Sequence, residues 1–192
     1  MSLHPKQMRT RALAALLALA ALTAPAAAQQ GGQPLSPRDT ARLEIAAGKR
    51  VYVDYGRPSM RGRRIVGELV PYGRVWRTGA NAATTLVTET DLRIGDALVP
   101  RGTYTLYTLP TAQGWTLIVN RQTGQWGTQY DASRDLVRIP MRSRRVAQPV
   151  EKFTIALERG TTRGTGTLAM AWENTRLTVP VRAQAAAATR RR

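Results

Sequence analysis

The sequence predicts an all-β protein, built as a single antiparallel β-sandwich or jelly-roll-like domain. Three observations support this fold class. Apolar and polar residues alternate in short runs, which is the pattern of strands that bury one face. Glycine, proline, aspartate and asparagine separate these runs at short intervals. After the first 28 residues, no long stretch shows the apolar period of a helix.

The expected strands follow one another from residue 51 onward. They are the runs 51–55, 84–90, 104–108, 115–119, 153–157, 168–172 and 177–181. Turns are expected at Gly95-Asp96, Gln113-Gly114 and Glu173-Asn174, and between Gly160 and Gly166. Residues 64–70 fit either a short helical turn or an extra strand. Pro180 has no backbone N–H, so the last strand is expected to lie at an edge of the sheet or to fray there.

The two ends of the chain differ in composition from the part between them. Residues 1–28 combine a basic start, an apolar run (13–22) and the small residues Ala26-Ala27-Ala28, which together predict a cleaved secretory signal peptide. The apolar run is short for a stable bilayer span, which disfavours the alternative of a permanent N-terminal anchor. Residues 29–40 are expected to be a flexible linker, 41–183 the β-sandwich domain and 184–192 a disordered basic tail. The mature protein is therefore expected outside the cytoplasm, periplasmic or secreted, with no transmembrane anchor.

The segment 52–85 has a composition unlike that of a strand or a helix, because arginine, tyrosine, tryptophan and asparagine are interspersed with glycine and proline. Such a segment predicts a long ordered loop, and ordered loops often carry binding residues. Guanidinium groups pair with anionic groups, aromatic rings stack on sugar rings, and an asparagine amide can bond hydroxyls. The candidate ligand-binding residues are Tyr55, Arg57, Arg61, Arg63, Tyr72, Trp76, Arg77 and Asn81.

The same residues also have a purely structural interpretation. A long loop leaves backbone carbonyls without partners, and a side chain such as Arg77 can satisfy them while Trp76 fills the core. For Trp126, which stands in Gln-Trp-Gly, core packing is favoured. Deep burial of Trp76, Arg77 and Asn81 would indicate a scaffold without a small ligand. An open pocket bordered by unpaired guanidinium groups would indicate binding.

Missing residue types restrict the chemistry. The chain has no Cys, and its single His, His4, lies in the predicted signal peptide. Ser-His-Asp and Cys-His catalysis and the usual zinc and copper sites are therefore excluded for the mature chain, so neither a cofactor nor a metal is expected. Paired carboxylates keep open an alternative function, a hydrolase or lyase that acts on envelope polysaccharide. Its candidate residues are Asp54, Glu68, Asp131 and Asp135.

The chain carries a formal net charge of +17, and such a field attracts anions. Nearly all of the basic residues are arginines, and they are spread along the whole chain, which is also typical of genomic composition bias. Because the protein is expected to be exported, an anionic or glycan ligand is the expected partner and nucleic acid is not. The sequence leaves the oligomeric state open.

Several ordered motifs resemble one known family. They include Tyr55-Gly-Arg57-Pro58, Leu69-Val70-Pro71-Tyr72-Gly73, Val75-Trp76-Arg77-Thr78-Gly79-Ala80-Asn81, Gln125-Trp126-Gly127 and Tyr130-Asp131. Over about residues 36–183 the chain is similar to the bacterial secreted family called domain of unknown function 2911. The resemblance implies a small exported all-β domain and assigns no activity. Members often carry Glu directly after the Gly-Ala-Asn triplet, whereas this chain has Ala82, so the resemblance offers no catalytic carboxylate there.

Overall fold

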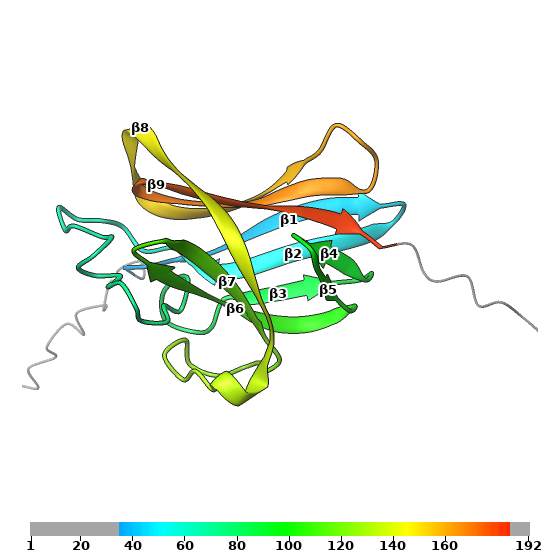
Figure 1. The fold of residues 1–192 in the computed structure, drawn as a ribbon, viewed down its shortest axis with the longest axis horizontal. Coiled ribbons are helices and arrows are strands. Elements are labelled where there is room, and N and C mark those ends of the chain that lie inside the picture. The colour runs from blue at the N-terminus through cyan, green and yellow to red at the C-terminus, as the bar shows by residue number, and fades with distance from the viewer. Residues whose placement is uncertain (1–34, 185–192) are drawn as a thin grey trace, which may run out of the picture. The chain divides into compact units, whose positions relative to one another are not determined.

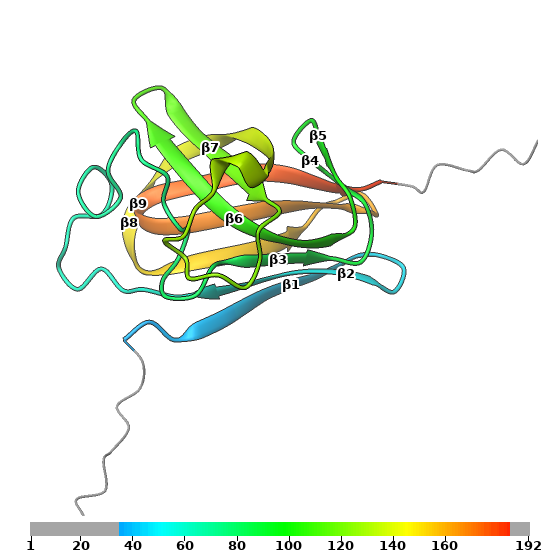
Figure 2. The same cartoon turned by 90° about the horizontal axis from the view of Figure 1, so that it is seen from below.

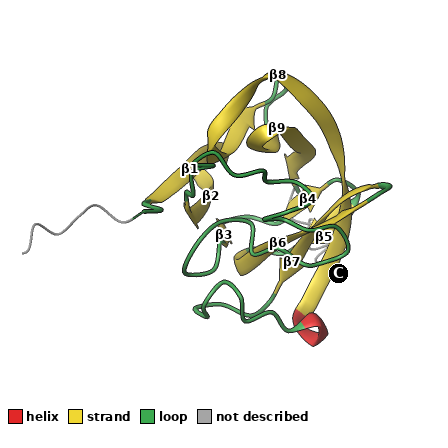
Figure 3. Cartoon of the chain, turned by 90° about the vertical axis from the view of Figure 1, so that its left-hand side faces the viewer, coloured by secondary structure: helices red, strands yellow, loops and turns green. Residues whose placement is uncertain are grey.

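The computed structural model describes residues 35–184. The predicted signal peptide, residues 29–34 of the predicted linker and residues 185–192 of the predicted tail lie outside the described residues. Within the described range the strands are β1 (Arg38–Ala46), β2 (Lys49–Gly56), β3 (Thr85–Thr88), β4 (Leu92–Ile94), β5 (Ala97–Val99), β6 (Gly102–Thr111), β7 (Gly114–Asn120), β8 (Asp135–Arg159) and β9 (Thr165–Ala183). One short 3-10 helix, η1 (Ala132–Arg134), precedes β8 and is the only helix of residues 35–184 (Figure 3).

Neighbouring strands all run antiparallel, in the order β1-β2-β3-β6-β7-β8-β9-β4-β5. The long strand β8 shapes the domain, because residues 135–141 pair with β7 whereas residues from 142 onward pair with β9. β8 thus crosses from the layer that holds β6 and β7 to the layer that holds β9 (Figures 1 and 2). β1 also lies against β8 and β9, so the sheet folds over itself into a sandwich-like all-β domain.

The hydrophobic core lies between these layers. Alternate residues of β2, namely Val51, Val53 and Tyr55, are buried, as the period of two requires. The Tyr55 ring packs edge-on against Phe153 of β8, with ring centres 5.7 Å apart. Its hydroxyl accepts a hydrogen bond from the backbone N–H of Ile155 at 3.0 Å. Tyr55 is therefore a core residue that joins β2 to β8.

The predicted fold class is confirmed, but the sequence pattern misses β1. This strand begins at Arg38, inside the segment 29–40 that was expected to be a linker. Its first residues are polar, so they show no apolar alternation. The structure pairs them with charged residues that lie elsewhere in the chain, Arg38 with Asp54 and Asp39 with Arg57. These ion pairs help to hold the start of β1 beside β2.

Two expectations about the last strands are wrong. The runs 168–172 and 177–181 belong to one strand, β9. Glu173 does not lie in a turn; it has a left-handed backbone conformation (φ 51°) at the point where the β8–β9 ladder shifts register. Such a bulge lets a long strand bend without ending. β9 is also not an edge strand, since it lies between β8 and β4. Pro180 is tolerated because pairing with β8 has ended at Thr178, while pairing with β4 starts only at Val181.

Residues 64–70 form neither a helix nor a regular strand. They make a tight turn in which the N–H of Val70 donates to the carbonyl of Ile65 at 2.8 Å. This turn buries Ile65 and Val70 and exposes the residues between them, apart from the half-buried Val66. In the part of the chain that the structure describes, no helix has the length and apolar character to cross a bilayer.

Candidate functional site

The β2–β3 loop (residues 57–84) projects at one end of the layers, at the left of Figures 1 and 2, and runs along β6. Of the residues of β6, only 102–105 pair with β3. Further along, Trp76 and Thr108 exchange two backbone hydrogen bonds of 2.8 and 3.0 Å, and Gly73 donates to the carbonyl of Pro110 at 2.7 Å. An edge without such partners would leave backbone groups unsatisfied. The loop therefore completes the sheet, and these bonds fix its shape.

Two glycines allow the end of this loop to approach β2 closely. A Cβ atom on Gly56 would overlap the carbonyl oxygen of Ala80. A Cβ atom on Gly79 would lie 3.0 Å from the carbonyl oxygen of Gly56 and 2.8 Å from the hydroxyl of Thr84. Neither position has room for a side chain, so the two glycines set the distance between residues 76–81 and the sheet.

Two residues of the same segment, Thr78 and Asn81, have left-handed backbone conformations, with φ of 52° and 63°. This region is unusual for a β-branched residue such as Thr. Thr78 is fully buried, its hydroxyl bonds to that of Thr108 at 3.1 Å, and its carbonyl accepts from the hydroxyl of Thr84 at 2.7 Å. Backbone strain of this kind persists only where the surroundings impose it, and it is often found at functional sites. The fold thus holds the neighbours of Thr78 in fixed positions.

The β7–β8 loop (residues 121–134) lies against the end of the β2–β3 loop. The N–H of Gly127 donates to the carbonyl of Asn81 at 2.9 Å, and the N–H of Ala83 donates to the carbonyl of Gln125 at 3.2 Å. A Cβ atom on Gly127 would stand 2.7 Å from the Asn81 carbonyl oxygen and 3.0 Å from Cδ of Arg77. Gly127 therefore lets the Arg77 side chain lie directly on the backbone of the second loop.

A cleft of about 500 Å³ opens between these two loops. Its polar and aromatic lining comes from Arg63, Trp76, Arg77, Asn81, Tyr107, Thr128, Tyr130 and Trp172, and its apolar lining includes Leu35 and Leu69. No carboxylate of the described residues belongs to this lining. We call this feature the loop cleft. Its size suits a small molecule or a few sugar units.

Several N–H groups at the loop cleft have no protein partner among residues 35–184. Arg77 donates from Nε to the carbonyl of Gly79 at 3.2 Å, which leaves both terminal nitrogens of its guanidinium group unbonded. Arg63 donates from Nε and Nη2 to the carbonyls of Met60 and Ser59 and keeps Nη1 unbonded. The side-chain amide of Asn81 makes no hydrogen bond within the same range. The cleft can therefore donate to a ligand that carries acceptor oxygens.

A hydrogen-bond network holds Tyr130 at the cleft. Its hydroxyl donates to Oδ2 of Asp135 at 2.7 Å and accepts from Nη2 of Arg138 at 2.8 Å. Asn120 donates to the other carboxylate oxygen of Asp135 at 2.8 Å. Burial, followed by the hydrogen bond to Asp135, raises the pKa of Tyr130 to about 12. The phenol thus stays protonated over the whole physiological range.

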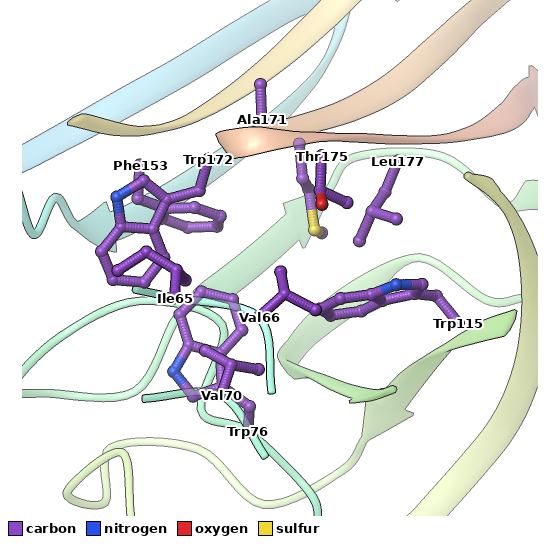
Figure 4. Close-up of a pocket in the computed structure, with 11 residues that line it drawn as sticks. Ile65, Val66, Val70, Trp76, Trp115, Phe153, Ala171, Trp172, Thr175 and Leu177 are labelled. Atoms are coloured by element: carbon purple, nitrogen blue, oxygen red, sulfur yellow. The ribbon is translucent and has the colours of Figure 1, made fainter. Parts of the chain in front are cut away.

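Trp76 forms part of two features at once. Its ring stacks on Trp172, with ring centres 5.6 Å apart, and meets Phe153 edge-on at 5.0 Å. Figure 4 shows these rings beside a small apolar cavity, of about 20 Å³, that Trp115 also lines. The same Trp76 also lines the loop cleft. Its indole is therefore held rigidly by core packing while it contributes to the cleft wall.

The structure brings together four of the predicted ligand-binding residues, Arg63, Trp76, Arg77 and Asn81, and separates the other four from them. Tyr55 belongs to the core. Arg57 donates to the carbonyl of Phe153 at 3.2 Å and to the hydroxyl of Thr154 at 3.0 Å. Both side chains thus have protein partners in the core or on β8, as the structural interpretation expects.

The two remaining predicted residues lie away from the loop cleft. Arg61 is exposed and donates to the carbonyl of Leu35 at 3.0 Å. Tyr72 is 55% exposed and packs beside Gly67, outside the cleft lining. Both residues belong to the same β2–β3 loop as the four cleft residues, but the path of the loop places them at other surfaces.

Sequence reasoning missed Tyr107, Thr128, Tyr130 and Trp172 as cleft residues. Apolar alternation in the run 168–172 marks Trp172 only as core, and in the run 104–108 it sets Tyr107 opposite Tyr104 and Leu106. Tyr130 belongs to a motif that was visible in the family resemblance, and this was the one available signal. The prediction for Trp126 is wrong, since its side chain is 51% exposed. The backbone of Trp126 pairs with Ala82, and this pairing leaves its ring at the surface.

The four candidate carboxylates each have local partners. Asp54 pairs with Arg38, Glu68 lies 3.8 Å from Arg64, and Asp131 caps η1 by accepting from the N–H of Ser133 at 2.9 Å. Asp135 accepts the hydrogen bond of the Tyr130 hydroxyl. None of the four lines the loop cleft, so the cleft contains no carboxylate pair for general acid and base chemistry. The described residues also hold no cluster of metal-binding side chains.

Comparison with known proteins gives a family for this fold and site. The family model described as Protein of unknown function (DUF2911) matches residues 36–181. This range contains both loops of the cleft and every strand except the last two residues of β9. Searches of the curated proteins and of the solved structures found no match. The chain therefore belongs to the family of proteins of unknown function called DUF2911.

Proposed function

We propose that this protein is an exported β-sandwich that binds an anionic or polyhydroxylated, glycan-like ligand in the loop cleft. The observation that carries the proposal is the lining of the cleft. Arg77, Arg63 and Asn81 present N–H groups without partners among the described residues, and they stand beside the fixed indole of Trp76. Guanidinium and amide donors bind oxygen acceptors, and an aromatic face packs on a sugar ring.

Binding is favoured over hydrolysis because of the charges at the cleft. A glycosidase needs two carboxyl groups flanking the scissile bond. Asp135, which bonds the cleft residue Tyr130, is also engaged by Asn120 and Arg138. The lining instead carries guanidinium groups, which suits recognition of acceptor oxygens or negative charge.

Thermal-shift screening of the mature domain against glycans, nucleotides and small anions tests the proposal. A ligand present at a hundred times its dissociation constant should raise the free energy of unfolding by about 2.7 kcal/mol. For any hit, Arg77→Gln and Asn81→Ala should each weaken binding by about tenfold, because each variant loses donors to the ligand.

Arg74→Gln is the matched control for Arg77→Gln. Arg74 lies in the same loop, is exposed and does not line the cleft. The control should leave the affinity within about twofold, as expected for an isolated surface charge. Circular dichroism of each variant verifies folding. Unchanged affinity in both cleft variants would assign the ligand to another surface.

The compartment is part of the same proposal and has its own test. A protein that is exported after removal of residues 1–28 should begin at Gln29. Mass spectrometry of the full-length gene product, expressed in a bacterial host and separated into periplasm and cytoplasm, measures this directly. Recovery of the intact chain from the cytoplasm alone would contradict export.

A further inference from the structure

A second hollow, separate from the loop cleft, lies beside the crossover part of β8. It measures about 420 Å³ and is lined by Arg64, Tyr72, Ser143, Arg144, Arg145, Glu173, Asn174 and Thr175, with Val66. It shares no lining residue with the loop cleft, although Arg63 lines the cleft and the next residue, Arg64, lines this hollow. We call it the arginine groove.

An irregularity in the β8–β9 ladder builds this groove. The ladder shifts register between Arg145 and Val150, opposite the left-handed residue Glu173. Both sides of the irregularity are hydrogen-bonded: Glu173 accepts from the N–H of Val66 at 3.2 Å, and Asn174 donates to the carbonyl of Val146 at 3.1 Å. Bulges are frequent beside binding sites, because they redirect side chains and end regular pairing. The register shift and these two hydrogen bonds therefore give the groove a fixed shape.

The charges in the groove are not balanced. Arg144 and Arg145 are exposed, and neither forms an ion pair within residues 35–184. Arg64 has only Glu68, at 3.8 Å, and both side chains are mostly exposed, so this pair contributes little. The one carboxylate in the lining, that of Glu173, already accepts the Val66 hydrogen bond. Three arginines and one glutamate thus contribute to the lining.

The strand register places the side chains of this part of β8. Arg144 stands opposite Arg176 of β9, which does not line the groove, whereas Arg145 stands opposite Thr175, which does. Successive side chains of a strand point to opposite faces. Ser143, Arg145 and Thr175 therefore share the face on which the groove lies, and the Arg144 side chain lies on the opposite face.

We propose that the arginine groove is a second binding site, which takes a phosphate or sulfate group. Guanidinium forks bind such tetrahedral anions through paired N–H donors, and a double negative charge matches the guanidinium groups of Arg64 and Arg145 better than a single carboxylate does. The hydroxyls of Ser143 and Thr175 supply further donors around the anion. This site is independent of the ligand proposed for the loop cleft.

Calorimetric titration of the mature domain with inorganic pyrophosphate at low salt tests the proposal. The native protein should bind it saturably. The double variant Arg64→Gln with Arg145→Gln should weaken binding by tenfold or more, because each substitution removes charge-assisted hydrogen bonds to the anion. The matched control is Arg159→Gln with Arg163→Gln, which removes the same charge from exposed arginines of the β8–β9 turn.

The control should leave pyrophosphate binding within about twofold, since unpaired surface charges far from the site are screened. An equal loss in both double variants would show diffuse attraction to the basic surface and overturn the proposal, as would a native protein that does not saturate. Arg77→Gln should leave pyrophosphate binding unchanged. That variant separates a failure of the groove from a failure of the loop cleft.

Vesicles distinguish the two sources of such a group. Native protein should sediment with phosphatidylglycerol vesicles, and the groove variant should not, if the group belongs to a lipid headgroup. If the group belongs to a soluble molecule, phosphatidylglycerol vesicles should bind no more protein than phosphatidylcholine vesicles, while pyrophosphate still saturates the groove. The proposal would be contradicted if the groove variant bound vesicles as well as the native protein does and also kept its affinity for pyrophosphate.

Discussion

The two halves of the β2–β3 loop have similar compositions and use their polar side chains differently. In the first half, residues 57–64, Arg57 donates inward to Phe153 and Thr154, and Arg63 uses two of its three guanidinium nitrogens for the nearby carbonyls of Met60 and Ser59. In the second half, residues 76–81, Arg77 makes one such bond and Asn81 makes none with its amide within the described chain. Arginine content alone therefore does not separate structural residues from binding residues. The two kinds of residue are separated only by which protein groups each arginine bonds and which of its N–H groups stay without a partner.

The largest effect is expected where the second half touches β2. Gly56→Ala should lower the free energy of unfolding by about 3 kcal/mol, because the new Cβ overlaps the carbonyl of Ala80 and forces the second half away from β2. Urea denaturation measures the change. Gly48→Ala is the control, since its Cβ meets nothing within 4 Å and only its left-handed φ of 63° is strained, at about 1 kcal/mol. Equal losses in the two variants would mean that the contact between β2 and the second half is not tight.

The second prediction contrasts one arginine from each half. Arg57→Gln should lower the free energy of unfolding by about 2 kcal/mol, because the Phe153 carbonyl and the Thr154 hydroxyl lose a charged donor. Its affinity for any probe identified in the thermal-shift screen should stay within about twofold, since it removes no cleft donor. Arg77→Gln should reverse this pattern, with a stability loss of about 1 kcal/mol or less and an affinity loss of about tenfold. Similar profiles for the two variants would contradict the division of the loop.

Tyr130 allows the β7–β8 wall of the cleft to be tested through pH. Burial and the hydrogen bond to Asp135 raise its pKa to about 12, whereas a tyrosine in the unfolded chain ionises near pH 10. The folded state therefore holds this proton more tightly, so its contribution is complete below about pH 10 and is lost as the pH rises toward 12. Burial raises the pKa of Tyr55, Tyr104 and Tyr107 in the same direction.

Stability measured by chemical denaturation should consequently fall between about pH 10 and 12. Tyr130→Phe should show a shallower fall and, at neutral pH, a loss of about 1 kcal/mol from the missing hydrogen bonds. A stability curve that is flat up to pH 12 in the native protein would contradict the described network.

The smallest effect on stability is expected at Asn81. Asn81→Gly removes the side-chain amide but suits the left-handed φ of 63°, so the free energy of unfolding should change by less than about 0.5 kcal/mol. Asn81→Ala removes the same amide and strains the backbone, which should cost about 1 kcal/mol more. Both variants should lose probe affinity equally if the amide contacts the ligand. Full affinity in Asn81→Gly would limit Asn81 to a backbone role.

Much of the fold could be predicted from local pattern, and the failures have physical causes. Runs such as 115–119 and 153–157 alternate because one face of each strand meets the core, and each lies in an observed strand. β1 escaped prediction because its first residues are polar, and they are attached by the backbone ladder with β2 and by ion pairs with Asp54 and Arg57. The bulge at Glu173 resembled a turn, because a local sequence cannot show that long-range pairing with β8 continues on both sides of it.

The candidate site was predictable by segment but only partly by residue. Glycine, proline and arginine identified the long loop, and Arg63, Trp76, Arg77 and Asn81 do meet at one cleft. Trp126 illustrates the opposite case, since an aromatic residue beside a glycine gives no sign of whether its ring faces in or out. The backbone pairing of Ala82 with Trp126, between two loops far apart in the chain, exposes the ring.

Composition and local periodicity were enough to establish an all-β domain, an ordered loop rich in arginine, and the absence of histidine and cysteine from residues 29–192. These properties depend on each residue and its near neighbours. The location of the cleft was decided only by tertiary contacts, because Gly127 and Asn81 are joined across two loops and Tyr130 is oriented by Asp135 and Arg138. Whether an arginine bonds the protein or stays open to a ligand depends on which distant carbonyls the fold leaves within its reach, and no local pattern contains that information.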